Sequence, residues 1–270
     1  MRASCQLFFI VYTCTTMEFE QYLPLDRAVI EGGTFQFHCH PGVSCFLSCC
    51  RNVDMLLFPY DIILLKNHLN IHSSDFLHKY TRLCEGSHPF FPGLKLSMGA
   101  DEQHSCPFLT DGGCGVYKNR PSACRTYPLE RGVEQRSQGA ALKAHYFMTH
   151  HPYCMGHFEA RRYSVSQWER DQMLHECNQY NDNWAELDAF FATNPWAGEG
   201  DAGPHQQLAF MVCYNIDAFR TYVEKHNLVN AFKLRKEERR HILKDDGALL
   251  RFGFDWLEYI LGGRRKLMKK

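Results

Sequence analysis

Seven cysteines gathered in two short stretches have the clearest capacity for chemistry in this sequence. The first stretch, residues 39–50, reads CHPGVSCFLSCC, and the second, residues 106–128, carries three more cysteines. Thiolates this dense are typical ligands of soft metal ions and of iron–sulfur clusters. The sequence therefore predicts a metal-binding protein whose ligands are Cys39, Cys45, Cys49, Cys50, Cys106, Cys114 and Cys124.

Cys154, which lies downstream in HHPYCMG, is a candidate eighth ligand. Eight thiolates could supply two four-thiolate sites, or one cluster with spare cysteines. The alternative for any of these cysteines is a buried, unreactive side chain that behaves as a small apolar residue. That second role is expected for the remaining cysteines, which are Cys5, Cys14, Cys84, Cys177 and Cys213.

The spacing of the cysteines also bears on which metal they bind. Zinc sites usually combine two C-x2–4-C pairs that lie well apart, whereas here only Cys45 and Cys49 have this spacing. The adjacent pair Cys49-Cys50 is awkward for one small tetrahedral ion and suits a larger cluster better. The sequence thus favours a [4Fe-4S] cluster, with zinc as the alternative.

Basic residues flank the cysteines. Arg51, Arg120 and Arg125 could offset thiolate charge or bind an anionic cofactor or substrate. Alternatively, they brace the loops by donating hydrogen bonds to local carbonyl and carboxylate oxygens. Three histidines near the cysteines could also be ligands, although the thiolates already suffice; they are His38, His40 and His104.

Composition narrows the class of protein. The chain has 270 residues with 30 Lys+Arg and 30 Asp+Glu, so no bulk charge draws it to nucleic acid or to an anionic membrane. Thirteen cysteines are an odd number in a chain too large for a typical disulfide scaffold, which favours a reducing, cytoplasmic location.

No segment has the roughly 18 consecutive apolar residues that a membrane span needs. Residues 1–16 imitate a signal peptide, but their apolar run (LFFIVY) is shorter than the ~7–15 residues of a real one. We interpret them as an over-called upstream start.

Short strands and helices are expected around the first cysteines. Alternating apolar residues predict strands at 35–37 and 94–98. Helical spacing predicts one helix that begins near Pro59 and a shorter one capped by Ser73 or Ser74. Within 106–128, glycines and prolines exclude long regular structure, so metal–thiolate bonds are expected to hold this loop in shape.

The remainder of the chain is expected to be mostly helical. A capping box at 166–169 predicts a helix that continues to Phe191. The seven apolar residues 208–214 suggest a buried strand. Asp217 is expected to cap the next helix, and Asp245 or Asp246 the last.

The predicted fold class is α+β: a loop-rich, metal-binding cysteine-cluster module with packed C-terminal helices. Residues 1–32 are interpreted as a lead-in and residues 33–156 as the cysteine-cluster domain. Residues 157–270 are interpreted as a helical extension packed on that domain.

The two cysteine stretches together resemble the CxxCxxCC putative zinc- or iron-chelating family, also called YkgJ-like cysteine cluster proteins. The family name describes C-x2-C-x2-C-C, whereas this chain has C-x5-C-x3-C-C, with longer loops and the same number of thiolates. The matching motifs are Phe37-x-Cys39, Cys45, Cys49-Cys50-Arg51, Cys106-Pro-Phe-Leu109, Cys114-x-Val-Tyr117 and Arg120-Pro121-x-x-Cys124-Arg125-x-Tyr-Pro128.

The resemblance implies metal binding and opens three functional readings. One relative, flagellin lysine N-methylase, implies a [4Fe-4S] enzyme that methylates a protein substrate with S-adenosylmethionine; an oxidoreductase is a related possibility. The sequence offers no glycine-rich nucleotide loop, H-E-x-x-H motif or hydrolytic triad, so the enzyme reading depends on the resemblance. The third reading is a zinc-binding structural or metal-handling protein without catalysis, which acts through a protein partner.

Overall fold

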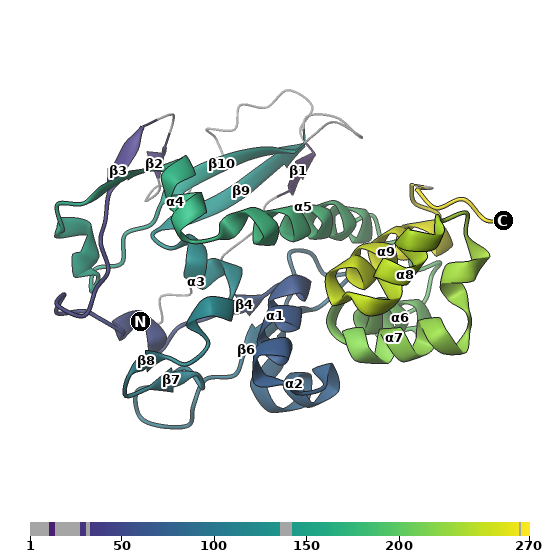
Figure 1. Ribbon diagram of the computed structural model, residues 1–270, viewed down its shortest axis with the longest axis horizontal. Coiled ribbons are helices and arrows are strands. Elements are labelled where there is room, and N and C mark those ends of the chain that lie inside the picture. The colour runs from purple at the N-terminus through teal and green to yellow at the C-terminus, as the bar shows by residue number, and fades with distance from the viewer. Residues whose placement is uncertain (1–10, 14–27, 31–32, 136–141, 265) are drawn as a thin grey trace. The chain divides into compact units, whose positions relative to one another are not determined.

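The computed structural model describes residues 11–13, 28–30, 33–135, 142–264 and 266–270 (Figure 1). Cys5, Cys14 and most of the signal-like segment lie outside these residues. Several small sheets combine with many helices, so the predicted α+β class is confirmed. None of the helices in the described residues is long and apolar enough to cross a membrane.

The chain forms two compact units, each made of two separate segments. The first unit contains Met1–Leu56 and Ser97–Asn178, and the second contains Leu57–Leu96 and Gln179–Lys270. All eight candidate ligands fall in the first unit. The division at residue 156 expected from the sequence stays a prediction.

Small sheets organise the first unit. In the largest, the strand order is β1-β9-β10-β2; β1 runs parallel to β9, and the other pairs are antiparallel. Two further antiparallel pairs are β3 with β11 and β7 with β8. The strands are β1 (Val11–Thr13), β2 (Ala28–Val29), β3 (Thr34–Gln36), β7 (Leu109–Thr110), β8 (Gly113–Cys114), β9 (Leu129–Gln135), β10 (Lys143–Met148) and β11 (Arg162–Ser164).

The helices of the first unit are short. They begin and end within the connections that carry the cysteines, as expected for a segment rich in glycine and proline. They are η2 (Ser48–Cys50), η3 (Tyr117–Asn119), α3 (Ser122–Thr126), η4 (Met155–Phe158) and α4 (Val165–Asp171).

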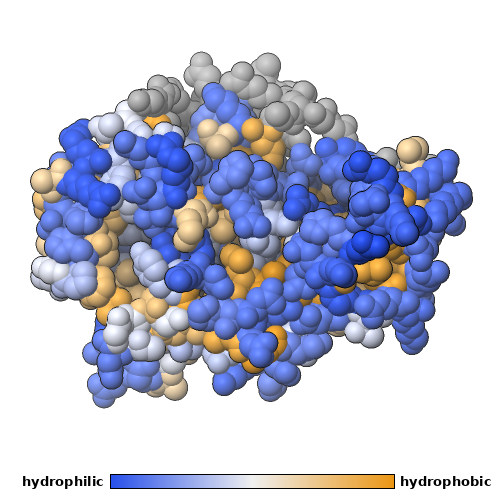
Figure 2. Space-filling model, in the orientation of Figure 1, coloured by the Kyte–Doolittle hydropathy of each residue, from blue (hydrophilic) through white to orange (hydrophobic). Residues whose placement is uncertain are grey.

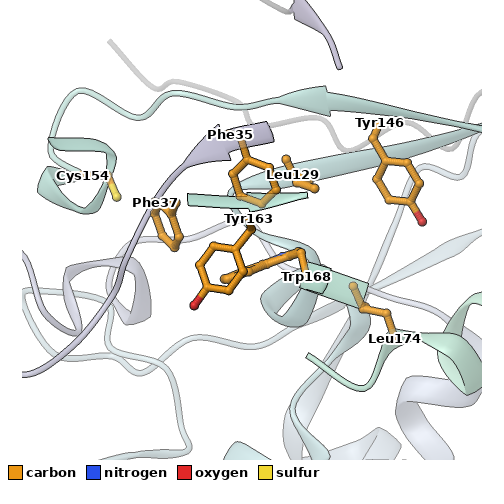
Figure 3. Close-up of a cluster of buried hydrophobic side chains, with 8 residues drawn as sticks. All are labelled: Phe35, Phe37, Leu129, Tyr146, Cys154, Tyr163, Trp168 and Leu174. Carbon is orange, nitrogen blue, oxygen red and sulfur yellow. The ribbon is translucent and has the colours of Figure 1, made fainter. Parts of the chain in front are cut away.

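Trp168 of α4 belongs to the buried cluster at the core of this unit (Figure 3). Its ring meets those of Phe35, Phe37 and Tyr163 nearly edge-on, at interplanar angles of 81°, 89° and 73°. Such aromatic pairs contribute roughly 0.5–1.5 kcal/mol each beyond the area they bury. Cys154 lies in the same cluster, so the core holds one candidate ligand directly.

The second unit is mainly helical, with one three-stranded sheet of order β4-β6-β5. Helix α9 contacts α1, α6, α7 and α8 and is therefore the central helix of this unit. The elements are β4 (Leu56–Leu57), α1 (Pro59–Leu69), α2 (Ser73–Tyr80), β5 (Thr81–Cys84), β6 (Gly93–Leu96), α5 (Leu174–Phe191, which begins in the first unit), α6 (Pro204–Tyr214), α7 (Ile216–Lys225), η5 (Leu228–Ala231), α8 (Lys236–Lys244) and α9 (Asp246–Ile260).

Figure 2 shows that hydrophilic residues cover much of the face in view, with hydrophobic residues in patches between them. This distribution is ordinary for a folded protein, because apolar atoms contribute more than half of a typical accessible surface.

A buried lysine links three helices of the second unit. Lys66 of α1 is 6% exposed, and its Nζ lies 2.9 Å from a carboxylate oxygen of Asp217 and 2.9 Å from one of Asp246. Arg220 also pairs with Asp246, at 2.6 Å. Burial raises the pKa of both carboxyl groups, but hydrogen bonds, first from Lys66, outweigh it and leave each pKa below its usual value. The network therefore favours the charged carboxylates.

We expect Lys66→Met to lower the unfolding free energy by about 3 kcal/mol, because it removes the cation from the partly buried Asp217 carboxylate and leaves Asp246 paired with Arg220. Urea unfolding at neutral pH measures the change. Lys225→Met, on the exposed side of α7, is the control and should change stability by less than about 0.5 kcal/mol. The loss should shrink below about pH 4, because protonated carboxyls no longer need the lysine. Equal losses in the two variants would contradict this role for Lys66.

The strands at 35–37 and 94–98 are confirmed as β3 and β6, and the helix that begins at Pro59 as α1. The last helix is also confirmed. The Asp245 carboxylate accepts a hydrogen bond from the Ala248 N–H at 2.7 Å, and Gly262 follows the helix end with a φ of +83°.

The strand predicted at 208–214 is wrong. These residues form the C-terminal part of α6, and those buried there include Ala209, Val212 and Cys213 at helical spacing. A short apolar run cannot by itself distinguish a buried strand from a buried helix. Pro204, at the first turn of α6, was the overlooked start signal.

Three predicted helix starts and one predicted continuation also differ from the structure. The capping box is formed by Ser164 and Gln167, because Glu169 bonds the Tyr146 hydroxyl instead. The helix expected to continue to Phe191 breaks at Met173, whose φ is +53°.

The other two starts shift because the expected caps bond elsewhere. His72 accepts the capping hydrogen bond of α2, while the Ser73 hydroxyl donates to Asn215. The Asn215 side chain in turn caps α7, because Asp217 is engaged with Lys66.

Candidate metal centre

Strand β3 leads the chain from the core to Cys39. Phe37, just after the strand, is buried, whereas Cys39 is exposed. The Phe37 N–H donates to the Arg161 carbonyl at 2.9 Å, and the His38 N–H donates to the Gly156 carbonyl at 3.0 Å. These bonds fix the backbone immediately before the first cysteine.

A run of tight turns brings the next three cysteines together. Four N–H groups between residues 40 and 50 each donate to the carbonyl three residues earlier. The turn expected at Pro41-Gly42 is confirmed. Leu47 has a φ of +66°, and the short helix η2 then presents Cys49 and Cys50.

The second cysteine stretch docks directly on the first. The Cys106 N–H donates to the Cys50 carbonyl at 2.8 Å, and the Asn52 N–H donates to the His104 carbonyl at 3.1 Å. Two cysteines 56 positions apart in the sequence are therefore hydrogen-bonded through their backbones.

A small hairpin places Cys114 near Cys106. Leu109 of β7 pairs with Cys114 of β8, and the Leu109 N–H donates to the Cys106 carbonyl at 3.0 Å. Gly113 has a φ of +117°, a conformation that favours glycine. The glycines of this stretch thus serve to turn the chain between two candidate ligands.

Cys124 and Cys154 come from helix-like segments. Cys124 is exposed on α3, with its Sγ 3.8 Å from the Met55 sulfur. Cys154 is buried and immediately precedes η4. The Met155 N–H donates to the Cys45 sulfur at 3.1 Å, which ties the Cys154 segment to the first stretch.

Electrostatic contacts define a first cysteine group. The pKa of Cys39 is raised to about 11. Partial burial of the sulfur is the first cause, and the charges of Cys49, Cys45 and Cys154 are the next. The charge of Cys45 and its hydrogen bond likewise act on Cys154. We define group A as Cys39, Cys45, Cys49 and Cys154.

A second group forms around the docked stretches. Cys50 lies within electrostatic range of Cys106 and Cys124, and Cys106 within range of Cys114. The Arg120 guanidinium interacts with the charges of both Cys124 and Cys114. We define group B as Cys50, Cys106, Cys114 and Cys124.

The adjacent cysteines join the two groups. A hydrogen bond between the two side chains lowers the pKa of Cys49 to about 7 and raises that of Cys50. Cys49 also acts on Cys39 in group A and on Cys106 in group B. Cys49 therefore faces both groups.

Backbone N–H groups point at several sulfurs. Burial raises the pKa of Cys106, but N–H bonds from Phe108 and Leu109 oppose that rise. Burial also raises the pKa of Cys154, opposed by hydrogen bonds from Tyr127 and the Gly156 N–H. Donors of this kind stabilise thiolates and tune a metal that they bind.

The three arginines donate hydrogen bonds to protein oxygens. Arg51 is exposed and donates to the Gln103 side chain at 2.5 Å. Arg120 and Arg125 are buried and both bond Gln172, through its side chain at 2.5 Å and its carbonyl at 3.2 Å. These bonds brace the loops, and a cofactor-binding role stays a prediction.

The cysteines expected to be buried and unreactive are described in part. Cys177 and Cys213 are 3% and 2% exposed, and Cys84 is half-buried in β5. No disulfide bond joins cysteines within the described part of the chain.

Tyr127 was missed by the sequence reasoning. Its hydroxyl hydrogen-bonds Cys154, and burial first, followed by that contact, raises the pKa of the phenol. The only available signal was its position three residues after Cys124, in the Cys-Arg-Thr-Tyr-Pro run.

Comparison with known families identifies this segment. Residues 38–155 match the model of the CxxCxxCC family, described as a putative zinc- or iron-chelating domain. This segment is similar to the CxxCxxCC family. No curated protein and no solved structure matches the chain.

The CxxCxxCC segment contains all eight cysteines of groups A and B. Metal binding, predicted from the thiolates, is thus supported by the family as well as by their arrangement. Glu159 and the helices after it lie beyond the matched segment.

Proposed function

We propose that this is an iron–sulfur protein whose groups A and B each hold a [4Fe-4S] cluster. The observation that supports the proposal is that the contacts among the eight cysteines allow two sets of four, which adjoin at Cys49 and Cys50. A [4Fe-4S] cluster takes four thiolate ligands, so each set is complete. The longer C-x5-C-x3-C-C loops keep the full number of thiolates.

The spacing of the sulfurs also favours a cluster over single zinc ions. At a Zn–S distance of about 2.3 Å, the sulfurs of a tetrahedral site lie roughly 3.8 Å apart. Among the described residues, no three cysteine sulfurs lie within 4.8 Å of one another. A [4Fe-4S] cluster binds one thiolate at each iron corner and therefore accepts more widely separated sulfurs.

The surroundings suit a redox centre. Hydrogen bonds to cysteine sulfurs and burial are the means by which a protein sets the potential of a cluster. Here Cys154 is buried and bonded by Tyr127, whereas Cys39, Cys49 and Cys124 are exposed. A bound cluster would supply one-electron transfer at a site that a partner can approach.

Methyl transfer from S-adenosylmethionine to a protein lysine remains a narrower prediction, as does residence in the cytoplasm. Zinc bound in a structural or metal-handling role is the alternative at the same cysteines. An enzyme of the methylase kind requires S-adenosylmethionine binding to the metal-loaded protein, which calorimetry measures directly.

The first experiment is metal and acid-labile sulfide analysis of anaerobically purified protein, together with its visible spectrum. Two clusters would give about eight iron and about eight sulfide per chain, with a brown colour that dithionite bleaches. Stoichiometric zinc in a colourless protein without sulfide would overturn the iron–sulfur assignment and leave the zinc-binding alternative.

A further inference from the structure

Two histidines that flank Cys39 lie close to one carboxylate at the end of η4. One ligand atom each from His38, His40 and Glu159 lies within 4.8 Å of the others. The His40 Nε2 is 3.3 Å from a Glu159 carboxylate oxygen, and the two imidazole centroids are 4.6 Å apart. The sequence indicated these histidines only as possible additional ligands near the cysteines, and it gave no signal for Glu159.

The backbone explains why these side chains meet. Strands β3 and β11 are antiparallel, with Arg162 opposite Gln36. The Phe37 N–H bond to the Arg161 carbonyl continues this pairing toward the cysteines. Residues two apart in an extended chain project to the same side. His38 and His40 can therefore lie on one side of the chain, with Cys39 on the other.

Glu159 is held opposite them by η4. Its N–H donates to the Gly156 carbonyl at 3.4 Å, and that same carbonyl accepts from the His38 N–H at 3.0 Å. One carbonyl therefore fixes both sides of the three-residue group. Gly156 is buried against Phe37, so the position of this carbonyl is set by the core.

The distances and exposure suit a metal ion. Two ligands of one tetrahedral ion, at about 2.0–2.1 Å each, lie roughly 3.3 Å apart, which is the His40–Glu159 distance. Both side chains are more than a third exposed, so an ion can enter from solvent. Two imidazoles and one carboxylate are the ligands of open zinc sites and of non-haem iron(II) sites.

We propose that His38, His40 and Glu159 bind one divalent first-row metal ion, such as Zn²⁺, at a site separate from the thiolate groups. Three protein ligands leave a coordination position open for water or another small ligand. The donors are nitrogen and oxygen, whereas groups A and B offer only sulfur. The proposal therefore stands whether the cysteines hold clusters or zinc.

Metal binding changes two existing contacts of His40, because the ion takes the place of the direct contact between Nε2 and Glu159 and also affects the bond at Nδ1. The Gly42 N–H donates to the His40 Nδ1 at 3.2 Å. With metal on Nε2, the proton of the neutral imidazole resides on Nδ1, so the Gly42 N–H turns to water. Replacing the imidazole by water as the acceptor costs little free energy, because Gly42 lies in an exposed turn.

The test is calorimetric titration of Zn²⁺ into purified protein whose cysteines already hold their metal. We expect one further equivalent to bind, with no change in the number of thiols that react with a disulfide reagent. His38→Gln combined with His40→Gln should abolish this equivalent. Glu159→Gln should weaken it by at least about 10- to 100-fold, the loss typical of an outer carboxylate that only supports a ligand, because Glu159 is itself a proposed ligand.

The controls are His104→Gln and Glu102→Gln, which alter exposed residues outside the group. Both should bind the extra zinc as wild type does. The proposal is overturned if wild type takes no further equivalent, or if the ligand variants bind it unchanged. It is equally overturned if the added zinc protects thiols, which would place the ion on cysteines. Iron and sulfide content, measured separately, reports on the clusters alone.

Discussion

Cys154→Ser is expected to lose about half of the bound iron and sulfide while keeping the rest. Cys154 belongs to group A, and the four cysteines of group B remain intact without it. Cys124→Ser should show the converse loss from group B. A variant with both changes should hold almost no iron. Metal and sulfide analysis of the three proteins after anaerobic purification measures these losses.

The matched control is Cys84→Ser, which changes a half-buried cysteine of the second unit that lies in neither group. It should retain the full iron content. Full iron in Cys154→Ser would remove Cys154 from the ligand set. Complete loss in either single variant would contradict two separable sites and would indicate one site that spans Cys49 and Cys50.

Removing the metal is expected to release the loops of the first unit while leaving the second unit folded. Structural zinc in small domains contributes on the order of 10 kcal/mol to folding, and loops without regular structure depend most on such bonds. We expect the aromatic core around Trp168 to persist without metal, because its rings pack on one another. We therefore expect the loss to concentrate in residues 39–50 and 106–124.

Hydrogen exchange before and after chelation measures this effect. The Cys106 amide donates the hydrogen bond that joins the two stretches, whereas the Cys50 and Leu109 amides bond within their own stretch. All three should exchange much faster in the metal-free protein. The Leu249 amide, in the first turn of α9, is the internal control and should be unchanged. Equal protection with and without metal would show that the loops hold their own shape.

Ligand chemistry could be predicted from the sequence because it depends on residue type and spacing. Cys39 to Cys50 and Cys106 to Cys124 each lie within a short loop, where few conformations are available. Two four-thiolate sites were one of the alternatives, but which cysteine falls in which group could not be predicted. It depends on the backbone bond between Cys50 and Cys106 and on the Met155 N–H at Cys45, neither of which leaves a signal in side-chain identity.

Helix boundaries show a similar limit. Of the two caps predicted for the last helix, Asp245 is the one that bonds the helix start, whereas the Asp246 carboxylate pairs with Lys66 and Arg220. Asp217 was predicted wrongly because Lys66, distant in sequence, binds its carboxylate. The helix at 204–214 was missed because the seven apolar residues 208–214 fit either a strand or a helix, and tertiary packing decides between them. Local signals therefore succeed where no long-range partner competes.

The interleaving of the two units also orders events during synthesis. The segment Leu57–Leu96 of the second unit separates the two cysteine stretches, and the last ligand of group A is Cys154. At roughly 5–20 residues per second, a ribosome needs about 6–23 s to travel from Cys39 to Cys154. Throughout that interval the nascent chain carries group A thiols before all four cysteines of the group have been synthesised. All four cysteines of group B are present once Cys124 has emerged. Group B can therefore bind its metal or cluster before group A does, and that binding can order the chain before Cys154 emerges.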